Sequence, residues 1–576
     1  LAISGLHVGI VASFFFFLFS RFFSLSRTFL DHAWTFKASA LLSIVPVTLY
    51  GLLAGMSPST QRAVIMISVF LITFLIRRRQ DSINTLAIAA LAILTVHPPA
   101  LFSISFQLSF TAVFAILFGF SRMGKSETRF DTHFPVQKKI SAFFLVSLFA
   151  ILGSLPLVMY YFNQVSLVGI FANFILVPLI GFLVVPIGLI SVFFLPISQT
   201  ISSIGFQAGG FFLSHAINVV HFFSNLAFSS VKTVTPSMLE ISLYYLMGGY
   251  LFYFVTHHRS IIDATKTLIN EGFRLKGPVI IISTLVMITA ADISYWLYTR
   301  FFHQDLRITI VDVGQGNAAI VEFPGGKTMM IDGGGFYDNN IFDVGERIIA
   351  PLLWQKKIKT VDTLILTHPD SDHLNGLLYI ARHFNVKTVR TNGEPSQTLG
   401  YQEFIKIIHE KNIQTPEFSA LNKNFEVNGV NAYIFYPPED FIERKKNESW
   451  RDTNSSSMVI KLEMGEFSCL FTGDIKAKSE AELLSISNGD LKSLVLIAPH
   501  HGSKTSSTKN FLDSVNPETV IFCAGWNNRF NLPNEHVIKR YRQRDVRIFR
   551  TDYNGAVTIR TDGISTRITP FLIADI

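Results

Sequence analysis

The stretch Thr367-His368-Pro369-Asp370-Ser371-Asp372-His373 places two imidazoles and two carboxylates close together in the chain. It directly follows the apolar run Thr363-Leu364-Ile365-Leu366, which has the composition of a buried β-strand. Imidazole nitrogen and carboxylate oxygen are ligands that bind Zn²⁺ and Mn²⁺. The sequence therefore predicts a divalent-metal site at the end of this strand. Four residues are candidate ligands: His368, Asp370, Asp372 and His373.

Two later apolar runs also end at potential metal ligands. Ser468–Thr472 leads to Asp474, and Leu494–Ala498 leads to His500 and His501. We expect a sheet that delivers these side chains from its strand ends into one cleft, where one or two divalent cations activate water for hydrolysis. Asp474 is expected to bridge or complete the site, and either His500 or His501 to close it. Three residues are expected to act in catalysis: Asp372, His373 and Asp474.

Turn-forming stretches follow the first strands of this region. Leu306–Val311 has the pattern of a strand and runs into Asp312-Val313-Gly314-Gln315-Gly316, and Thr328–Ile331 runs into Asp332-Gly333-Gly334. A histidine that binds a metal usually donates its other ring N–H to a carboxylate or carbonyl. Asp312 and Asp332 are therefore predicted to orient a histidine ligand.

The composition divides the chain into two parts. Hydrophobic residues make up 49% of the 576 residues and charged residues 16%, which is too apolar for an ordinary soluble protein. Long apolar runs fill residues 1–300, whereas residues 305–576 have the composition of a soluble domain. We therefore predict a polytopic α-helical membrane bundle over 1–300 and an α/β domain over 305–576.

About ten apolar segments in the first part are long enough, or nearly so, to cross a bilayer. The segment 62–76 is short, and 166–196 contains three prolines, so it forms one bent crossing, a re-entrant pair or two spans. The predicted segments are 1–20, 38–55, 62–76, 83–97, 102–120, 140–162, 166–196, 204–226, 237–255 and 278–298.

Positive charge is concentrated in the predicted membrane part, where residues 1–304 contain 18 Lys and Arg against 8 Asp and Glu. Basic loops favour the cytoplasmic side of a membrane, so this excess indicates membrane topology rather than a basic nucleic-acid-binding globule. The four most basic loops are 21–37, 77–79, 122–139 and 256–277. They share one face if 166–196 crosses an odd number of times. The last segment then leads outward and places residues 305–576 outside the cytoplasm.

Polar residues inside the predicted spans have two possible roles. They occur at Ser4–His7, Ser57–Arg62, Ser103–Ser109 and Asn173. Such residues either join helices through hydrogen bonds or line a polar path through the bundle. Both roles stay open from the sequence.

Seven short motifs follow one another along both parts of the chain: LAISGLHVG (1–9), SFQLSF (105–110), DVGQG (312–316), IDGG (331–334), THPDSDH (367–373), FTGD (471–474) and PHHGS (499–503). Together they resemble the ComEC family of competence proteins. The THPDSDH motif is similar to the main metal-binding motif of the metallo-β-lactamase superfamily. The resemblance implies a membrane channel followed by a metallo-β-lactamase-like domain of the αββα type.

This resemblance implies a function in DNA uptake at the bacterial cytoplasmic membrane. Family members import transforming DNA as a single strand, and their β-lactamase-like domain degrades the other strand. The implied partners are duplex DNA at the outer face, a single strand in the channel, membrane lipids, a DNA receptor and a cytoplasmic translocase. The implied cofactor is Zn or Mn, as one or two ions. Family members carry a further N-terminal part with an OB-like domain, so this chain is expected to be a fragment.

Three positions depart from the family pattern. Asp370 stands where the superfamily motif has a second histidine, Asn317 where the family has aspartate, and Leu532 where it often has histidine. These departures leave one metal position and the nuclease activity open. The resemblance also implies substrate or metal contacts for Asn454, Ser503 and Lys504, and turn capping is the alternative for Asn454.

Two other functions stay open from the sequence. The second part could hydrolyse a different phosphoester or ester, with the spans as an anchor, although ten spans exceed what an anchor needs. Alternatively, the chain is a channel that carries an inactive β-lactamase-like scaffold. The complete motif from His368 to His373 argues against a scaffold, whereas Asn317 and Leu532 argue for one.

Overall fold

The computed structural model describes most of the chain: residues 5–31, 34–56, 58–73, 82–123, 135–257, 276–421, 423–487 and 489–573. Contacts divide the chain into two compact units, Leu1–Leu285 and Val286–Ile576. This division falls inside helix α13 (Lys276–Leu297), ahead of the boundary between 300 and 305, which stays a prediction. Ser4, Ser57 and the basic run 77–79 lie outside the described residues, as do most of the basic loops 122–139 and 256–277.

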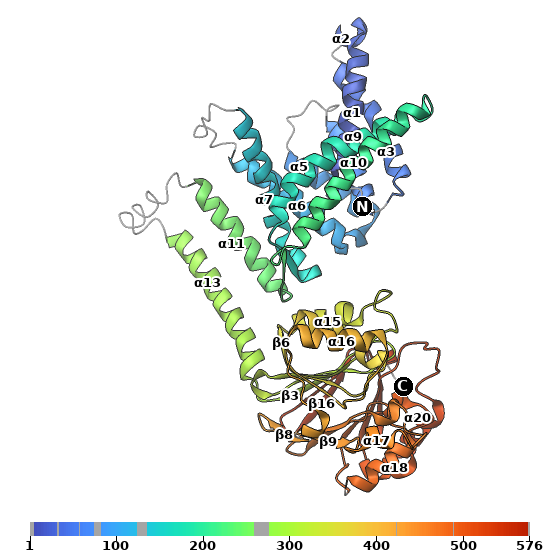
Figure 1. Cartoon of the computed structure of the whole chain (residues 1–576). Helices are drawn as coiled ribbons and strands as arrows, with labels where there is room; N and C mark the ends of the chain where they lie inside the picture. Colours follow the sequence, from blue (N-terminus) through green and yellow to red (C-terminus); the bar gives the residue numbers. More distant parts are fainter. Residues whose placement is uncertain are drawn as a thin grey trace. The chain divides into compact units, whose positions relative to one another are not determined.

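Helices make up nearly all of the described part of the first unit (Figure 1). In their described parts, the ten predicted apolar segments all coincide with helical structure. Such segments suit a bilayer because a helix satisfies its backbone hydrogen bonds internally. The long helices are α1 (Gly5–Ser24), α3 (Thr35–Leu53), α4 (Pro58–Thr73), α5 (Ser82–Val96), α6 (Ile104–Met123), α7 (Pro135–Phe162), α10 (Gln199–Ser224) and α11 (Met238–His257).

Six helical stretches among the described residues are long and apolar enough to cross a membrane, and they identify a multi-pass membrane protein. Two shorter apolar helices, Thr60–Thr73 and Ser82–Val96, accompany them. Helices α10 and α11, where further spans are predicted, are not among the six. The six are His7–Ser24, Thr35–Leu53, Ile104–Ser121, Ile140–Phe162, Gly169–Phe194 and Ile280–Phe302.

Within the proline-rich segment 166–196, residues 169–194 form one continuous helical path. Helix α8 (Gly169–Pro178) passes through a π-helical turn (Leu179–Val184) into α9 (Val185–Phe194). Proline lacks a backbone N–H, so Pro178 and Pro186 interrupt the normal i to i−4 bonding around this turn. Of the three alternatives from the sequence, the single crossing agrees with this geometry.

Several polar residues in the described part of the first unit form hydrogen bonds between segments, among them Tyr161 and Asn163. Tyr161 on α7 donates to the Gln107 side chain on α6 over 2.8 Å. Asn163 donates to the Thr235 hydroxyl over 2.7 Å, next to a two-stranded ribbon of β1 (Gln164–Ser166) and β2 (Ser230–Lys232). These contacts favour a role in joining helices for Gln107 and for the end of α7.

The second unit contains two seven-stranded sheets. The first has the order β16-β15-β3-β4-β5-β6-β7 and the second β14-β13-β12-β11-β10-β9-β8. The first comprises β3 (Leu306–Ile310), β4 (Ala318–Glu322), β5 (Thr328–Gly333), β6 (Thr360–Leu366), β7 (Asn385–Thr391), β15 (Val557–Thr561) and β16 (Thr566–Pro570). The second comprises β8 (Asn424–Val427), β9 (Val430–Tyr436), β10 (Val459–Met464), β11 (Phe467–Phe471), β12 (Val495–Ile497), β13 (Thr519–Phe522) and β14 (Arg547–Arg550).

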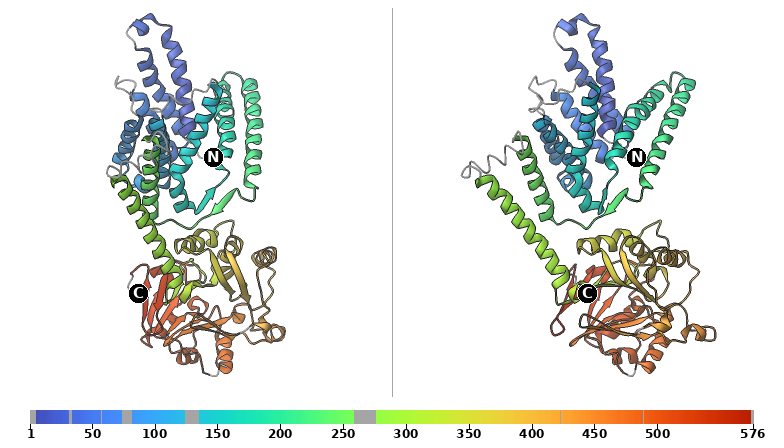
Figure 2. Two further views of the ribbon diagram at one scale, coloured as in Figure 1. Left: turned by 90° about the vertical axis from the view of Figure 1, so that its left-hand side faces the viewer. Right: turned by 60° about the vertical axis from the view of Figure 1, so that its left-hand side comes forward.

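The two sheets face each other across a shared apolar core. Leu306, Ile308 and Ile310 alternate along β3 and join Ile434, Ile460 and other residues of the second sheet in one cluster. Helix α15 (Ser371–His383) packs on the first sheet. On the outer side of the second sheet, a separate core forms with α18 (Ala477–Ile486), α19 (Lys509–Val515) and α20 (Glu535–Arg542). Figures 1 and 2 show the resulting layers of helix, sheet, sheet and helix, which confirm the predicted αββα class.

The strands that lead to the candidate ligands come from both sheets. Strand β6 belongs to the first sheet, whereas β11 and β12 are parallel neighbours in the second. The expectation that one sheet delivers every ligand is therefore wrong. The apolar runs alone do not determine which strands pair. A site formed between two sheets therefore could not be distinguished in the sequence from a site formed on one sheet.

Candidate metal centre

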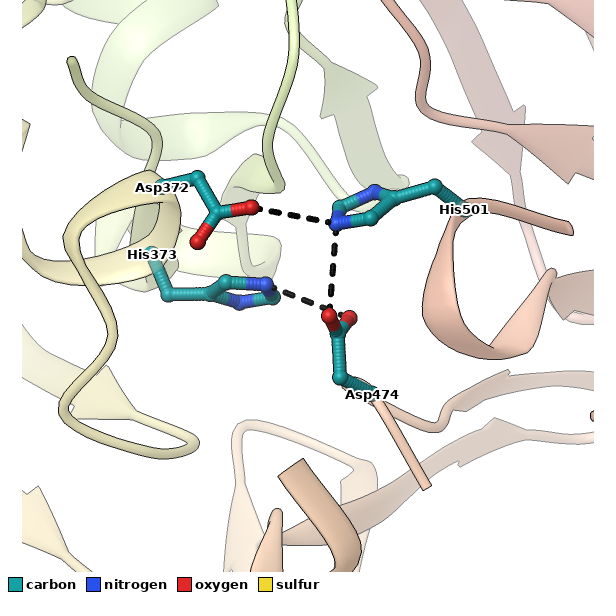
Figure 3. A group of neighbouring side chains, drawn as sticks. All are labelled: Asp372, His373, Asp474 and His501. Carbon is teal, nitrogen blue, oxygen red and sulfur yellow. Dashed lines mark ion pairs between the residues drawn. The ribbon is translucent and has the colours of Figure 1, made fainter. Parts of the chain in front are cut away.

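Four buried or half-buried side chains converge between the two sheets (Figure 3). Asp372 and His373 stand in the first turn of α15, Asp474 follows β11, and His501 follows β12. One ligand atom from each of the four lies within 4.8 Å of all the others. The His501 Nε2 atom is 3.5 Å from Asp372 Oδ2 and 3.4 Å from Asp474 Oδ2, and His373 Nε2 is 3.2 Å from Asp474 Oδ1. This spacing fits ligands around a single cation.

The backbone places these side chains by local geometry. Asp372 lies at the N-terminus of a helix, where the helix dipole stabilises a carboxylate. His500 and His501 both adopt left-handed backbone conformations, with φ of 50° and 53°. Such conformations are uncommon for residues other than glycine and often occur at functional sites. The turn 499–502 buries His501 in the cluster and leaves His500 half-buried beside it.

Three buried histidines at the site, His368, His373 and His501, each use Nδ1 for a hydrogen bond to a neighbour. His501 Nδ1 donates to the Cys523 carbonyl over 2.8 Å, His373 Nδ1 lies 2.7 Å from Asp332 Oδ2, and His368 Nδ1 lies 3.1 Å from Ser457 Oγ. A carbonyl or carboxylate only accepts, so the Nδ1 atoms of His501 and His373 carry a proton. In a neutral ring, this arrangement leaves the Nε2 lone pair available to a metal.

The remaining polar atoms of the cluster fit a cation. Among the described residues, the Nε2 atoms of His368, His373 and His501 and the Oδ1 atom of Asp474 are buried without a hydrogen-bond partner. Unpaired buried polar atoms are costly and therefore rare in native structures. Four such atoms in one cluster are satisfied together if a divalent cation binds between them, as imidazole and carboxylate ligands allow.

The electrostatics of the cluster also favour positive charge. Burial lowers the pKa of His501, but the nearby carboxylates of Asp474 and Asp372 outweigh this effect and raise it to about 10. Asp474 and Asp332 likewise raise the pKa of His373 well above its usual range against the effect of burial. Burial raises the pKa of Asp474, but His501 and His373 outweigh it and hold that pKa well below its usual range. The carboxylates thus stabilise positive charge on the His373 and His501 rings, at the place that a cation would occupy.

Asp332, near the end of β5, contacts a candidate ligand, and this contact fits its role in orienting a histidine, which stays a prediction. Its buried carboxylate accepts hydrogen bonds from the Thr367 N–H and the Thr367 hydroxyl, each over 2.8 Å, and faces His373 Nδ1. Its φ of 58° is a left-handed backbone conformation, which is uncommon for residues other than glycine. Thr367 is the first residue of the motif 367–373, and its bonds were not predicted from the sequence.

Ser457 connects two parts of the cluster. Its hydroxyl donates to the Asn454 carbonyl over 2.7 Å and accepts from the Asp474 N–H over 3.0 Å, while His368 Nδ1 lies beside it. The sequence pointed to this segment only through the family resemblance. The Asn454 side chain instead lies 3.3 Å from His500 Nε2.

Three further candidates lie beside the four-residue cluster. His368 Nε2 is 3.7 Å from Asp370 Oδ2, and the His368 ring lies 4.1 Å from the His373 ring. His500 Nε2 is 3.8 Å from Asp474 Oδ2, farther than His501. Burial and His373 lower the pKa of His368 to about 3, and burial and Asp372 raise the pKa of Asp370 to about 6. His368 and Asp370 could therefore hold a second cation next to the first.

Three predicted residues make other contacts. The Asp312 carboxylate accepts from the Gly314 N–H over 3.1 Å and shapes the turn 312–316, and burial raises its pKa. Ser503 shares a hydrogen bond with the Thr505 hydroxyl, and Lys504 is exposed. No described contact brings Asp312, Ser503 or Lys504 to the cluster. The prediction that Asp312 orients a histidine finds no support in these contacts, because its carboxylate is used within its own turn.

Comparison with known proteins assigns each part of the chain. Residues 1–257 match the family model of competence proteins, and residues 311–526 match that of the metallo-β-lactamase superfamily. ComE operon protein 3 of Bacillus subtilis is 27% identical over 97% of this chain and 67% of its own length. Competence protein ComA of Neisseria gonorrhoeae is 26% identical over 96% of this chain and 69% of its own length.

Solved structures match more distantly. A metallo hydrolase from the archaeon Ignicoccus hospitalis is 14% identical, covers 44% of this chain and 98% of its own, and has a TM-score of 0.29, which is too low to carry an argument. The assignment rests on the two family models and on relatives that cover nearly the whole chain. The chain belongs to the ComEC family of competence proteins, in which a competence-protein membrane domain is joined to a metallo-β-lactamase domain.

Proposed function

We propose that this protein takes up DNA through its membrane unit and cleaves DNA with a divalent metal ion bound between its two sheets. One observation carries the proposal: the buried Nε2 atoms of three histidines, none of which makes a hydrogen bond, converge with two carboxylates in a chain whose other unit spans a membrane. His373 and His501 contact the Asp372 and Asp474 carboxylates at 3.2 to 3.5 Å as ion pairs, but these Nε2 atoms make no hydrogen bond. A catalytic centre leaves them for a metal and its substrate.

The chain's own residues account for metal binding and substrate orientation. Asp372, His373, Asp474 and His501 hold the cation, and Asp332 keeps the His373 ring in place. A bound divalent cation supplies Lewis acidity, which polarises a phosphoester and activates water for its hydrolysis. Zn²⁺ and Mn²⁺ both suit this ligand set, as one ion, or as two if His368 and Asp370 hold the second.

The membrane unit is proposed as a path for a single DNA strand across the bacterial cytoplasmic membrane. The single helical path at 169–194 supports an odd number of crossings there. If each of the other predicted segments also crosses once, the basic loops share the cytoplasmic face. The second unit then lies outside the cytoplasm, where it meets incoming duplex DNA and degrades the strand that is not imported. A DNA receptor and a cytoplasmic translocase are the further partners proposed. The proposed boundary between channel and hydrolase lies between residues 300 and 305.

A cleavage assay on the full chain in detergent tests this proposal. Single- and double-stranded DNA are incubated with the protein and Mn²⁺ or Zn²⁺, beside an Asp372→Ala variant and a matched Asp362→Ala control. Asp362 lies near the start of β6, the strand whose other end leads into the motif, and there it accepts from the Thr328 N–H and binds Lys387. We expect cleavage by the parent and the control, and none by Asp372→Ala.

Two other results would contradict the nuclease. Cleavage of a lipid or cell-wall ester, but not of DNA, favours an anchored hydrolase of another substrate. Absence of cleavage with either cation favours a channel with an inactive scaffold. Asn317 and Leu532, which depart from the family pattern, are the residues that suggest this alternative. Asn317 still contributes its backbone, because its N–H donates to the Asp372 carbonyl over 3.2 Å.

A further inference from the structure

Two loops with exposed aromatic side chains are attached to the turns that carry the metal ligands. The first, the β5 loop, comprises residues 334–343 and follows β5. The second, the β13 loop, comprises residues 525–533 and lies between β13 and α20. Neither loop supplies a residue to the four-residue cluster.

The β5 loop is fixed to the first turns of α15, the helix that carries Asp372 and His373. The Gly376 N–H donates to the Gly334 carbonyl over 2.9 Å, and the Asn339 side chain donates to the Asn375 carbonyl over 2.9 Å. The Asn375 side chain in turn donates to the Phe336 carbonyl. These bonds hold the loop against the ligand-bearing turn.

The β13 loop is fixed to the turn that carries His501. Cys523, just before the loop, accepts the hydrogen bond of His501 Nδ1, and the Asn534 N–H, just after it, donates to the Gly502 carbonyl over 2.9 Å. Within the loop, the Asn528 side chain donates to the Gly525 carbonyl over 2.8 Å and also to the Leu532 carbonyl. The loop is therefore held in one shape by its own bonds.

Both loops present aromatic rings to solvent, and one ring of each loop has an arginine over it, Arg529 from within the β13 loop and Arg347 from just after the β5 loop. Tyr337 is 77% exposed and Trp526 75% exposed. In the β13 loop, the Arg529 guanidinium lies 4.7 Å from the centre of the half-exposed Phe530 ring. In the β5 loop, Phe342 has the Arg347 guanidinium 5.5 Å from its ring centre. Exposure of large aromatic rings is unfavourable in water, so such rings on braced loops beside a site indicate a ligand that covers them.

We infer that these two loops stack the unpaired bases of a DNA strand whose backbone lies at the metal cluster. Aromatic rings stack on any base, because every base has a π face, and arginine adds a cation that can pair with phosphate. Duplex DNA hides its base faces, so this surface selects a single-stranded or frayed end over an intact duplex. Trp526 and Tyr337 are positioning residues for the substrate strand and do not take part in the chemistry.

The inference rests on the proposed nuclease function, since it names the form of DNA that the site takes. Exposed tryptophan and tyrosine also occur where proteins meet a lipid headgroup layer. The arginine that accompanies a ring in each loop, and the attachment of both loops to ligand-bearing turns, favour a nucleic acid strand. Contact with lipid is the competing outcome of the test.

Binding is measured on the full chain in detergent, with Asp372→Ala introduced so that the DNA stays intact. The probes are a fluorescent oligothymidylate and an abasic oligodeoxyribose phosphate of the same length, in Mn²⁺. Trp526→Ala should weaken oligothymidylate binding about tenfold, the loss of one stacked base, and leave abasic binding unchanged. Trp526→Phe should restore binding to within about twofold, and Tyr337→Ala should cause a loss similar to Trp526→Ala.

The control is Phe571→Ala, because Phe571 is 81% exposed and follows β16, away from both loops in the sequence. The inference is overturned if the parent binds the oligothymidylate and the abasic probe with equal affinity. It is also overturned if Trp526→Ala weakens the binding of both probes equally. Quenching of Trp526 fluorescence by brominated lipid in nanodiscs, taken as the difference from Trp526→Phe, also overturns it. Cleavage by the protein with Asp372 intact is scored separately, so failure of the nuclease and failure of base stacking remain distinguishable.

Discussion

Replacement of Asp332 by asparagine tests how the protein controls its metal ligands. The carboxylate accepts three hydrogen bonds, from the Thr367 N–H, the Thr367 hydroxyl and His373 Nδ1. An asparagine oxygen can still accept from the Thr367 N–H, but its NH₂ group then faces two donors. His373 must move its proton to Nε2, where the proton points at the metal position.

The expected loss follows from that change of tautomer. Removal of a group that orients a metal-binding histidine lowers metal affinity by about 10- to 100-fold, which corresponds to about 1.4 to 2.8 kcal/mol. The Asp332→Asn variant should therefore bind Zn²⁺ or Mn²⁺ about 10- to 100-fold more weakly than the parent. The same variant should also unfold at a lower temperature without metal, since one bond to a charged group, about 1.5 to 3 kcal/mol, is lost.

Competition with a chromophoric chelator measures this affinity on the full chain in detergent. Asp362→Asn is the matched control, because Asp362 also accepts a backbone N–H and lies on β6, away from the cluster. Unchanged affinity in Asp332→Asn would refute the argument that the carboxylate sets the orientation of His373. An equal loss in both variants would show a general effect of destabilisation.

Four further results are expected. His501→Ala should lose far more metal affinity than His500→Ala in the same titration, because only His501 belongs to the buried cluster; the reverse order would contradict the site. A cation at a hundred times its dissociation constant should stabilise the parent by about 2.7 kcal/mol, seen as a higher melting temperature, and should not stabilise His501→Ala. Gly316→Ala should abolish metal binding and Gly314→Ala should not, since both have positive φ but only the Gly316 Cβ would lie 2.3 Å from a backbone oxygen of a ligand residue; equal effects would point to backbone strain alone. Tyr161→Phe should destabilise the membrane unit in detergent by about 0.6 kcal/mol, measured by thermal unfolding, and an unchanged melting temperature would mean that its bond to the next helix contributes nothing.

Local patterns predicted the elements of the second unit well. The apolar run before His368 is strand β6, and the runs before Asp474 and His500 are β11 and β12. Hydrophobic residues in short runs that end at glycine or proline specify strands through local preference and burial alone. The apolar segments of the first unit were equally clear, because length and hydropathy decide whether a helix suits a bilayer.

Long-range geometry was not available from the same patterns. The pairing of β6 in one sheet and of β11 and β12 in the other depends on the whole topology. The choice between His500 and His501 depends on two left-handed backbone conformations and on the Cys523 carbonyl, and any residue at position 523 offers a carbonyl. The sequence therefore carried no signal for this contact.

The metal content of the purified protein tests the central claim most directly. The full chain is dialysed with Zn²⁺ or Mn²⁺, freed of unbound ions, and its bound metal per chain is measured by mass spectrometry, beside the Asp372→Ala/Asp474→Ala double variant. The convergence of Asp372, His373, Asp474 and His501 predicts at least one ion per chain in the parent and none in the double variant. A parent that retains no ion, or a double variant that retains as many as the parent, would contradict a metal centre at this place.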